Sequence, residues 1–305
     1  MTRVGIRFES VVEFDAPTRA RRWPGFLLIL LGLGVAASAL LGPLLLGVIE
    51  YHASPGAIDQ ITGADVAALF LVAPLSIVAG ILALRGHRAA PVLAIGPAVF
   101  AVYTYTQLTL GGDFLRYPGN SEHFFLLNLG LFILGGVVAV AAWGSIDAPG
   151  LPKSSPRFDR FLGCVLLAAA GFLLVGLHLP HLLEMWRGEL SEAYLADPGV
   201  FWLVKLMDLG IVMPAMIGVG FGLLDHRTWA HKARYAVVGW FALLGASVAG
   251  MAIVMQANGD PGAAWANTIG FGVFAILGLA LAVILYRPLF ARALEPKSRG
   301  QLTTR

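Results

Sequence analysis

Two opposite charges lie three residues apart in an otherwise apolar stretch, WLVKLMDLGIVMPA at 202–215. Residues at i and i+3 of a helix share a face, so Lys205 and Asp208 would lie one turn apart. A charge deep in hydrocarbon costs at least a few kcal/mol and normally faces protein or water. Two interpretations stay open: a local ion pair in which Lys205 reaches toward the membrane surface, or an ion or proton site built on Asp208.

A second candidate site is the stretch HLPHLLE at 178–184. His178, His181 and Glu184 are spaced i, i+3 and i+6, and two imidazoles and a carboxylate could hold a metal ion if a further ligand such as His123 or His52 joined them. The spacing differs from the i, i+4 histidine pair of a metalloprotease helix. A polar cluster at the membrane interface is therefore the competing interpretation. Pro180 is expected to end or kink the helix.

Other polar residues fall at a similar depth in the apolar stretches, toward one side of the predicted membrane. They are Asp65, Tyr103, Gln107, Asn128, Gln256 and Asn267. The opposite half of the predicted spans carries almost none. This one-sided distribution predicts a polar cavity that is open to the extracytoplasmic side and holds an ion or a small substrate.

The elements that must position these residues are membrane-spanning helices. Hydrophobic residues make up 58% of the 305 positions and charged residues only 13%, which is far from the balance of a soluble domain. Continuous apolar runs of about 20 residues favour helices over a barrel. We expect an all-α protein with eight spans, at about 24–49, 63–84, 90–111, 122–145, 158–180, 199–224, 233–255 and 263–286.

The basic residues predict the orientation of these spans. If the N-terminus is cytoplasmic, 18 of the 21 Lys and Arg residues fall on the cytoplasmic side. Arg116, Arg187 and Lys205 are the exceptions. The positive-inside rule therefore predicts that both termini are cytoplasmic. The sequence pI of about 9.2 then reflects this sidedness and contact with anionic lipid, and it does not point to nucleic acid.

Polar landmarks recur along the chain, which predicts a tandem repeat of two four-helix units. The recurring residues form four pairs: Asp65 with Asp208, Pro74 with Pro214, Gln107 with Gln256, and Asn128 with Asn267. The members of these pairs lie 143, 140, 149 and 139 positions apart, and insertions in the loops would produce such a scatter.

The repeat divides the chain into a cytoplasmic N-terminal arm at 1–22, a first half at 23–145, a cytoplasmic linker at 146–157, a second half at 158–286 and a cytoplasmic tail at 287–305. Partial alternation of apolar and polar residues at 4–14 suggests a short cytoplasmic strand or an arm lying on the bundle. Cys164 is the one cysteine, so an internal disulfide is excluded. We expect it to be a small core residue.

Eight spans with histidines near one membrane face resemble haem A synthase, but in helix count only. Spans 2, 6 and 8 contain no histidine within the membrane, so that family's haem ligands do not transfer to this chain. No nucleophile with a base and no CxxC motif is present. The sequence therefore names no cofactor.

The stretches YTYTQ at 103–107, FFLLNLGLF at 124–132 and LMDLGIVMPA at 206–215 resemble uncharacterised multi-pass membrane proteins of high-GC bacteria. The resemblance implies a bacterial cytoplasmic membrane protein and brings no activity with it. A small-solute or ion transporter is the first functional expectation, because a repeat with a polar site between its halves is typical of alternating access. The alternatives are a membrane-embedded enzyme, a metal-, haem- or lipid-binding protein, and a non-catalytic assembly subunit.

Overall fold

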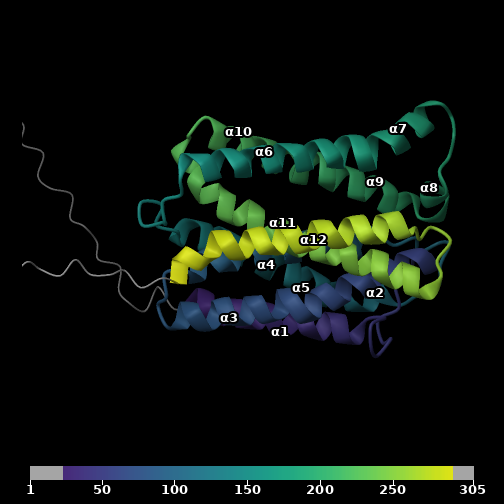
Figure 1. The fold of residues 1–305 in the computed structure, drawn as a ribbon. Helices are drawn as coiled ribbons and strands as arrows, with labels where there is room; N and C mark the ends of the chain where they lie inside the picture. The colour runs from purple at the N-terminus through teal and green to yellow at the C-terminus, as the bar shows by residue number, and fades with distance from the viewer. Residues whose placement is uncertain (1–22, 291–305) are drawn as a thin grey trace, which may run out of the picture.

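The computed structural model describes residues 23–290, and these residues are entirely helical apart from turns and loops (Figure 1). The arm at 1–22 and most of the tail, 291–305, with the strand expected in the arm, lie outside them. The first half comprises α1 (Trp23–Leu41), α2 (Pro55–Ala67), α3 (Ala73–Leu84), α4 (Ala90–Leu110) and α5 (Phe125–Ser145). The second comprises α6 (Pro156–Phe172), α7 (Leu179–Trp186), α8 (Glu192–Ala196), α9 (Pro198–Met207), α10 (Met213–Leu224), α11 (Thr228–Asn258) and α12 (Trp265–Tyr286).

Several of these helices join into longer spans through short irregular segments. One-turn π-helices connect α2 to α3 (Ala68–Val72), α6 to α7 (Leu173–His178) and α9 to α10 (Asp208–Val212). Short 3₁₀ turns precede α5 (Ser121–Phe124) and follow α12 (Arg287–Phe290). Eight resulting segments within residues 23–290 are long and apolar enough to cross a membrane, which confirms the expected number of spans. They are Pro24–Leu41, Pro55–Leu84, Ala90–Leu110, Ser121–Ser145, Pro156–Trp186, Pro198–Leu224, Thr228–Asn258 and Trp265–Phe290.

The first two spans differ from the expected boundaries for local reasons. The first ends at Leu41 rather than near 49, because Gly42 and Pro43 follow and a proline has no N–H to continue the helix. The second begins at Pro55, eight residues earlier than expected. Ser54 caps it by accepting a hydrogen bond from the backbone N–H of Ala57. The intervening loop therefore folds over one end of the bundle.

The outer surface of the bundle is apolar. Large side chains such as Leu126, Val140 and Ile276 are more than two-thirds exposed, which suits contact with lipid rather than water. Cys164 is also exposed, so the expectation of a core cysteine is wrong. It points away from the helix interface that Gly163 makes with α10.

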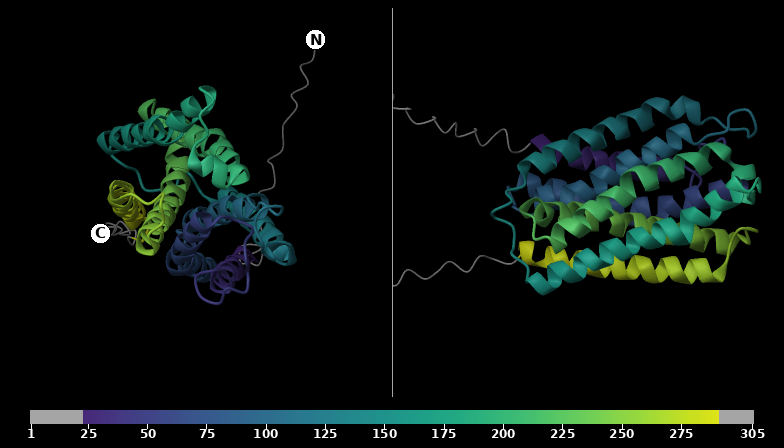
Figure 2. Two further views of the ribbon diagram at one scale, coloured as in Figure 1. Left: turned by 90° about the vertical axis from the view of Figure 1, so that its right-hand side faces the viewer. Right: turned by 90° about the horizontal axis from the view of Figure 1, so that it is seen from above.

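The helices run roughly parallel, so the bundle has two ends (Figure 1). One end carries α8 and the loops 42–54, 111–120 and 187–197, and we call it the α8 end. Trp23 and Phe290 lie at the other end, which we call the terminal end. Figure 2 (left) looks along the helices: α1–α5 form one group, α6 with α9 and α10 another, and α11 lies between them. α11 packs against α2, α4, α10 and α12 and so forms the centre of the bundle.

Glycine pairs bring two sets of helices together in the same way. A Cβ atom on Gly25 of α1 would lie 2.8 Å from the carbonyl oxygen of Gly80 on α3, and one on Gly163 of α6 would lie 2.9 Å from that of Gly220 on α10. Each pair lets two backbones approach closely. The α1–α3 and α6–α10 contacts thus rest on the same kind of glycine pair.

The turns that follow α3 and α10 also correspond. Gly86 and His226, 140 positions apart, both have positive φ, of 70° and 56°. In each turn the backbone N–H of the residue that follows the positive-φ residue donates to the carbonyl five residues before it. These bonds join His87 to Leu82 (2.9 Å) and Arg227 to Gly222 (2.8 Å).

The correspondence breaks down in one place. In the first half α1 packs against both α3 and α5. In the second half α6 packs along α10, but it makes no comparable contact with α12 within the described residues. The α6–α10 pair therefore stands apart from α12, and the main cavity of the protein lies behind this separation.

Candidate functional site

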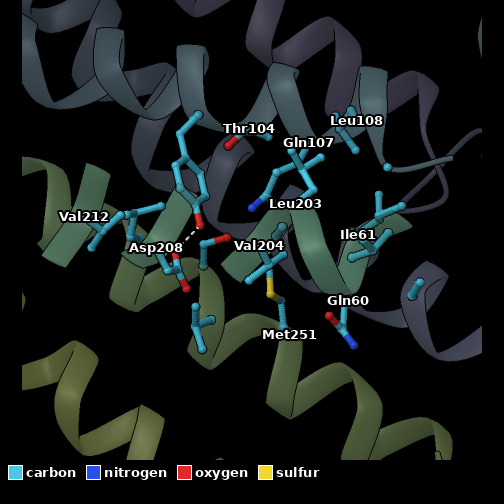
Figure 3. Close-up of a pocket in the computed structure, with 18 of the residues that line it drawn as sticks. Gln60, Ile61, Thr104, Gln107, Leu108, Leu203, Val204, Asp208, Val212 and Met251 are labelled. Atoms are coloured by element: carbon cyan, nitrogen blue, oxygen red, sulfur yellow. Dashed lines mark hydrogen bonds between the residues drawn. The ribbon is translucent and has the colours of Figure 1, made fainter. Parts of the chain in front are cut away.

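A cavity of about 280 Å³ lies between the two groups of helices. It reaches from the loops of the α8 end down to the last turn of α6 and the first turn of α10, where Ala169 and Met216 line it. Its walls come from α2, α4, α6, α9, α10, α11 and α12 and are mostly apolar. Figure 3 shows three side chains directed toward one space: Gln107 from α4, Asp208 from the start of the π-turn Asp208–Val212, and Met251 from α11.

Asp208 is the centre of the polar part of the cavity. Its Oδ1 accepts a hydrogen bond of 2.5 Å from the Tyr103 hydroxyl, the bond dashed in Figure 3, and its Oδ2 lies 3.0 Å from Nε2 of His178. The side chains of His178 and Asp208 are 6% and 15% exposed. Three spans therefore contribute one residue each to a largely buried carboxylate, hydroxyl and imidazole cluster.

The π-helical turns explain where Asp208 and His178 lie. Asp208 begins one such turn and His178 ends another. In both spans the residue before a proline bonds to the carbonyl five residues back: Met213 to Asp208, and Leu179 to Leu174. A wider turn accommodates a proline that can neither donate an N–H nor tolerate the usual carbonyl below its ring. Pro180 accordingly does not end its helix, which continues to Trp186.

Lys205 does not make the local ion pair with Asp208 that is one of the two interpretations of the sequence. It is buried, and its Nζ lies 3.3 Å from the centre of the Phe201 ring, a cation–π contact. No ion pair within 4.0 Å joins it to Asp208 in the described part of the chain, where the carboxylate instead contacts Tyr103 and His178. The two charges thus share a helix but have separate partners.

The other expected site residues divide into two groups. Asp65, Tyr103 and Gln107 line the cavity with Asp208. Asn128 and Gln256 do not line it, and each has a buried amide oxygen without a hydrogen-bond partner. Asn267 lines a smaller neighbouring cavity with Gln60.

The histidines expected to bind a metal do not converge on one point. Within residues 23–290 no group of three or more His, Cys, Asp and Glu side chains comes together that could hold a metal ion. His178 contacts Asp208, while the ring of His181 packs against Phe201 at 6.1 Å between centroids. Glu184 and His123 join neither contact. The geometry therefore favours a polar cluster over a metal centre here.

The loops of the α8 end cover the cavity, and their contacts were not apparent from the sequence. His52 lines the cavity at this end, with Nδ1 2.8 Å from the carbonyl of Tyr117 and Nε2 2.7 Å from Glu122. These two hydrogen bonds raise the pKa of His52 above its usual value. The loop at 42–54 is thereby tied to the segment that leads into α5.

Another contact at the same end, between Ser54 and Asp197, joins the helices of residues 23–145 to those of residues 158–286. Ser54, the cap of α2, donates through its hydroxyl to Asp197, and its backbone N–H donates to Oδ1 of Asp197 at 3.0 Å. Both residues are buried, and Asp197 directly precedes Pro198 of α9 as Ser54 precedes Pro55 of α2. The paired Ser-Pro and Asp-Pro dipeptides, 143 positions apart, are the sequence signal that could have located this contact.

The terminal end is closed by a buried ion pair that the sequence also did not reveal. Arg234 of α11 is 1% exposed; its Nη1 donates to Oδ1 of Asp159 at 2.6 Å, and its Nη2 donates to the carbonyl of Pro152 at 3.1 Å. The segment 146–157 is therefore fastened to α11, and the cavity does not extend to this end.

Comparison with protein-family models, with curated proteins and with solved structures finds no match to this chain. The resemblance to uncharacterised bacterial proteins is therefore supported only to the level of a multi-pass helical membrane protein. The function has to be argued from the cavity itself.

Proposed function

We propose that this protein is a transporter for a small, largely apolar solute that is neutral or cationic. The observation that carries the proposal is the apolar cavity with one buried carboxylate cluster at its centre. Pockets of this kind use their walls for affinity and a few placed polar groups for orientation. An apolar body would fill the space between α6, α11 and α12, and its polar group would meet Asp208 and Gln107.

The charge of the lining supports this choice of solute. Two aspartates, Asp65 and Asp208, line the cavity, and no Lys or Arg among residues 23–290 does so. An anion would therefore meet like charge in a region of low dielectric, where repulsion is strong. A cation or a neutral hydrogen-bond donor would be accepted.

The route into the cavity is inferred from its rim. Phe172 of α6 and Phe274 of α12 both line the cavity, yet they are 54% and 40% exposed. These rings lie where α6 and α12 fail to pack together. A solute dissolved in the membrane would enter between them, and the loops at the α8 end would restrict direct entry from water.

Transport, rather than binding alone, is supported by the corresponding features of the two halves. The glycine pairs, the turns after α3 and α10, and the π-turns before Pro74 and Pro214 recur about 140 positions apart. We interpret residues 23–145 and 158–286 as tandem copies of a four-helix unit joined by the linker 146–157. The α8 end would face outward from a bacterial cytoplasmic membrane, and rocking of the copies would alternate access.

Ethidium, a planar aromatic cation, is a suitable probe of the proposal. We expect purified protein to bind it and Asp208→Asn to weaken binding at least tenfold, or about 1.4 kcal/mol, because the carboxylate loses its charge without a change of shape. Asp225→Asn is the matched control, since Asp225 is exposed at the terminal end. Equal binding by the two variants would contradict the role of Asp208.

A second function, a one-sided binding pocket for a lipid, is favoured by the closed terminal end and the opening at Phe172 and Phe274. Ethidium uptake into proteoliposomes loaded with DNA separates the two functions. A transporter gives uptake above that of protein-free liposomes, and Asp208→Asn abolishes it. Binding without uptake would favour the one-sided pocket.

A further inference from the structure

Asp65 occupies a different part of the same cavity from Asp208. It lies on α2 and is 7% exposed, and its Oδ2 is completely buried without a hydrogen-bond partner. No ion pair involves Asp65 within the described residues 23–290. A buried carboxylate that has neither a cation nor a donor costs several kcal/mol, so its surroundings should show what balances the charge.

The carboxylate approaches the C-terminal end of α1. A Cβ atom on Gly42 would lie 2.8 Å from Oδ2 of Asp65, 3.3 Å from the carbonyl oxygen of Ser38 and 3.7 Å from that of Ala39. Because residue 42 has no side chain, these three oxygens can face one another across it. Any larger residue at 42 would fill this space.

The end of α1 makes the position still more electronegative. Helix C-termini carry a partial negative charge, although the carbonyls of Ser38, Leu40 and Leu41 at this end each accept a hydrogen bond from Gly42 or the loop that follows it. Residue 43 is proline, so the Ala39 carbonyl has no N–H four residues ahead to accept from. An ionised carboxylate beside this helix end would be repelled unless a cation lay between them.

Two buried tyrosine hydroxyls lie within electrostatic reach of the same carboxylate. The Asp65 carboxylate interacts electrostatically with the hydroxyls of Tyr51 and Tyr105, and both tyrosines are buried. The Tyr51 hydroxyl is also without a hydrogen-bond partner. Burial raises the pKa of Tyr51 far above its usual value, so its hydroxyl stays neutral and has a lone pair to offer.

We propose that Asp65 and the C-terminal carbonyls of α1 form a binding site for an alkali cation, Na⁺ or K⁺. Oxygen ligands suit hard cations. One carboxylate with otherwise neutral oxygens balances a single positive charge, whereas a divalent ion would be undercompensated in so buried a place. The site does not depend on the proposed transport, although a cation held there would alter the charge that a solute in the cavity meets.

Direct binding measurements on the purified full-length protein in detergent test the site. We expect the wild type to bind ²²Na⁺ or ⁸⁶Rb⁺, the latter standing for K⁺, with competition by the preferred ion and none by choline. Asp65→Asn should reduce binding at least tenfold. Asp59→Asn on the same helix should leave it unchanged, because Asp59 pairs with Asn258 outside this cluster.

Thermal unfolding gives a second readout that also checks folding. NaCl or KCl should raise the Tm of the wild type above its value in choline chloride at equal ionic strength, because a ligand that binds only the folded state stabilises it. In choline chloride the Tm of Asp65→Asn should equal or exceed that of the wild type. NaCl or KCl should not raise the Tm of this variant. The proposal is overturned if the wild type binds neither ion, or if Asp65→Asn binds as the wild type does.

Discussion

His52 uses both of its ring nitrogens at the α8 end of the cavity, one on a carbonyl and one on the Glu122 carboxylate. The ring is also 4.4 Å from that of Phe114, measured between centroids. A single residue thus joins the loop 42–54, the loop 111–120 and the start of the fourth span. We expect protonation of His52 to strengthen this connection, because the charged imidazole would face the Glu122 carboxylate.

We expect these contacts to make stability depend on pH. The folded-state pKa of His52 is raised above its ordinary value of about 6.5. Its stabilising contribution is therefore complete below that ordinary value and is lost as the pH rises through the raised folded-state value. The Tm of the wild type should fall over this range, as differential scanning fluorimetry would measure.

His52→Gln should lack this part of the pH dependence, whatever its effect on the Tm itself. His226→Asn is the control, because His226 is exposed at the terminal end and asparagine tolerates its positive φ. If His52→Gln keeps the same change of Tm with pH as the wild type, a group other than His52 causes that change.

Asp208 illustrates how far single residues could be predicted. The sequence marked it as an anomaly, because a carboxylate in an apolar helix is conspicuous without any structure. Its partners could not be predicted, since spacing along one helix identifies only neighbours on that helix. Tyr103 and His178 come from two other spans, and Lys205, the neighbour that spacing suggested, is turned to Phe201.

Among the elements, α2 and α11 make the closest backbone contact of the bundle's centre. A Cβ atom on Gly63 would lie 2.4 Å from the backbone of Gly250. A carbonyl group cannot move aside as a flexible side chain would. The two helices can therefore stay in contact only if both positions are glycine.

We expect Gly63→Ala to destabilise the protein by about 1–3 kcal/mol or more, as overpacking of a tight contact does. Gly218→Ala on α10 is the control. Nothing lies within 4 Å of its Cβ position, and alanine favours helix over glycine by up to about 1 kcal/mol. Thermal unfolding of both variants measures the difference. Equal Tm values would mean that α2 and α11 separate easily.

Helix boundaries were predicted well where a polar segment follows the span, and wrongly where an apolar loop follows, even though Gly42 and Pro43 supply a stop signal there. The span 199–224 was expected within a residue of Pro198–Leu224. The first span was extended wrongly to 49 because LLLGVI at 44–49 is as apolar as a helix. The π-turns could not be predicted from the sequence, although the prolines that accompany them are visible in it.

For the whole molecule, the number of spans follows from the sequence but the sidedness remains a prediction. Hydropathy is sufficient to count helices, because each must satisfy its backbone alone in lipid. Orientation depends instead on the distribution of charges between the loops and tails of the two sides.

Cysteine labelling of intact cells tests the orientation in a Cys164→Ala background. Glu189→Cys lies in an exposed loop of the α8 end, and Asp147→Cys is exposed in the linker. We expect a membrane-impermeant maleimide to label the first and to reach the second only after the membrane is permeabilised. The opposite pattern would place the α8 end in the cytoplasm.

The separation of α6 from α12 affects how concentration should be understood for this protein. A ligand that arrives between Phe172 and Phe274 comes from the hydrocarbon, so the relevant amount is the number of molecules dissolved in lipid. Partitioning enriches apolar compounds there. A modest intrinsic affinity would then suffice at trace aqueous levels, and compounds would be ranked first by solubility in the bilayer and only afterwards by their fit to Asp208.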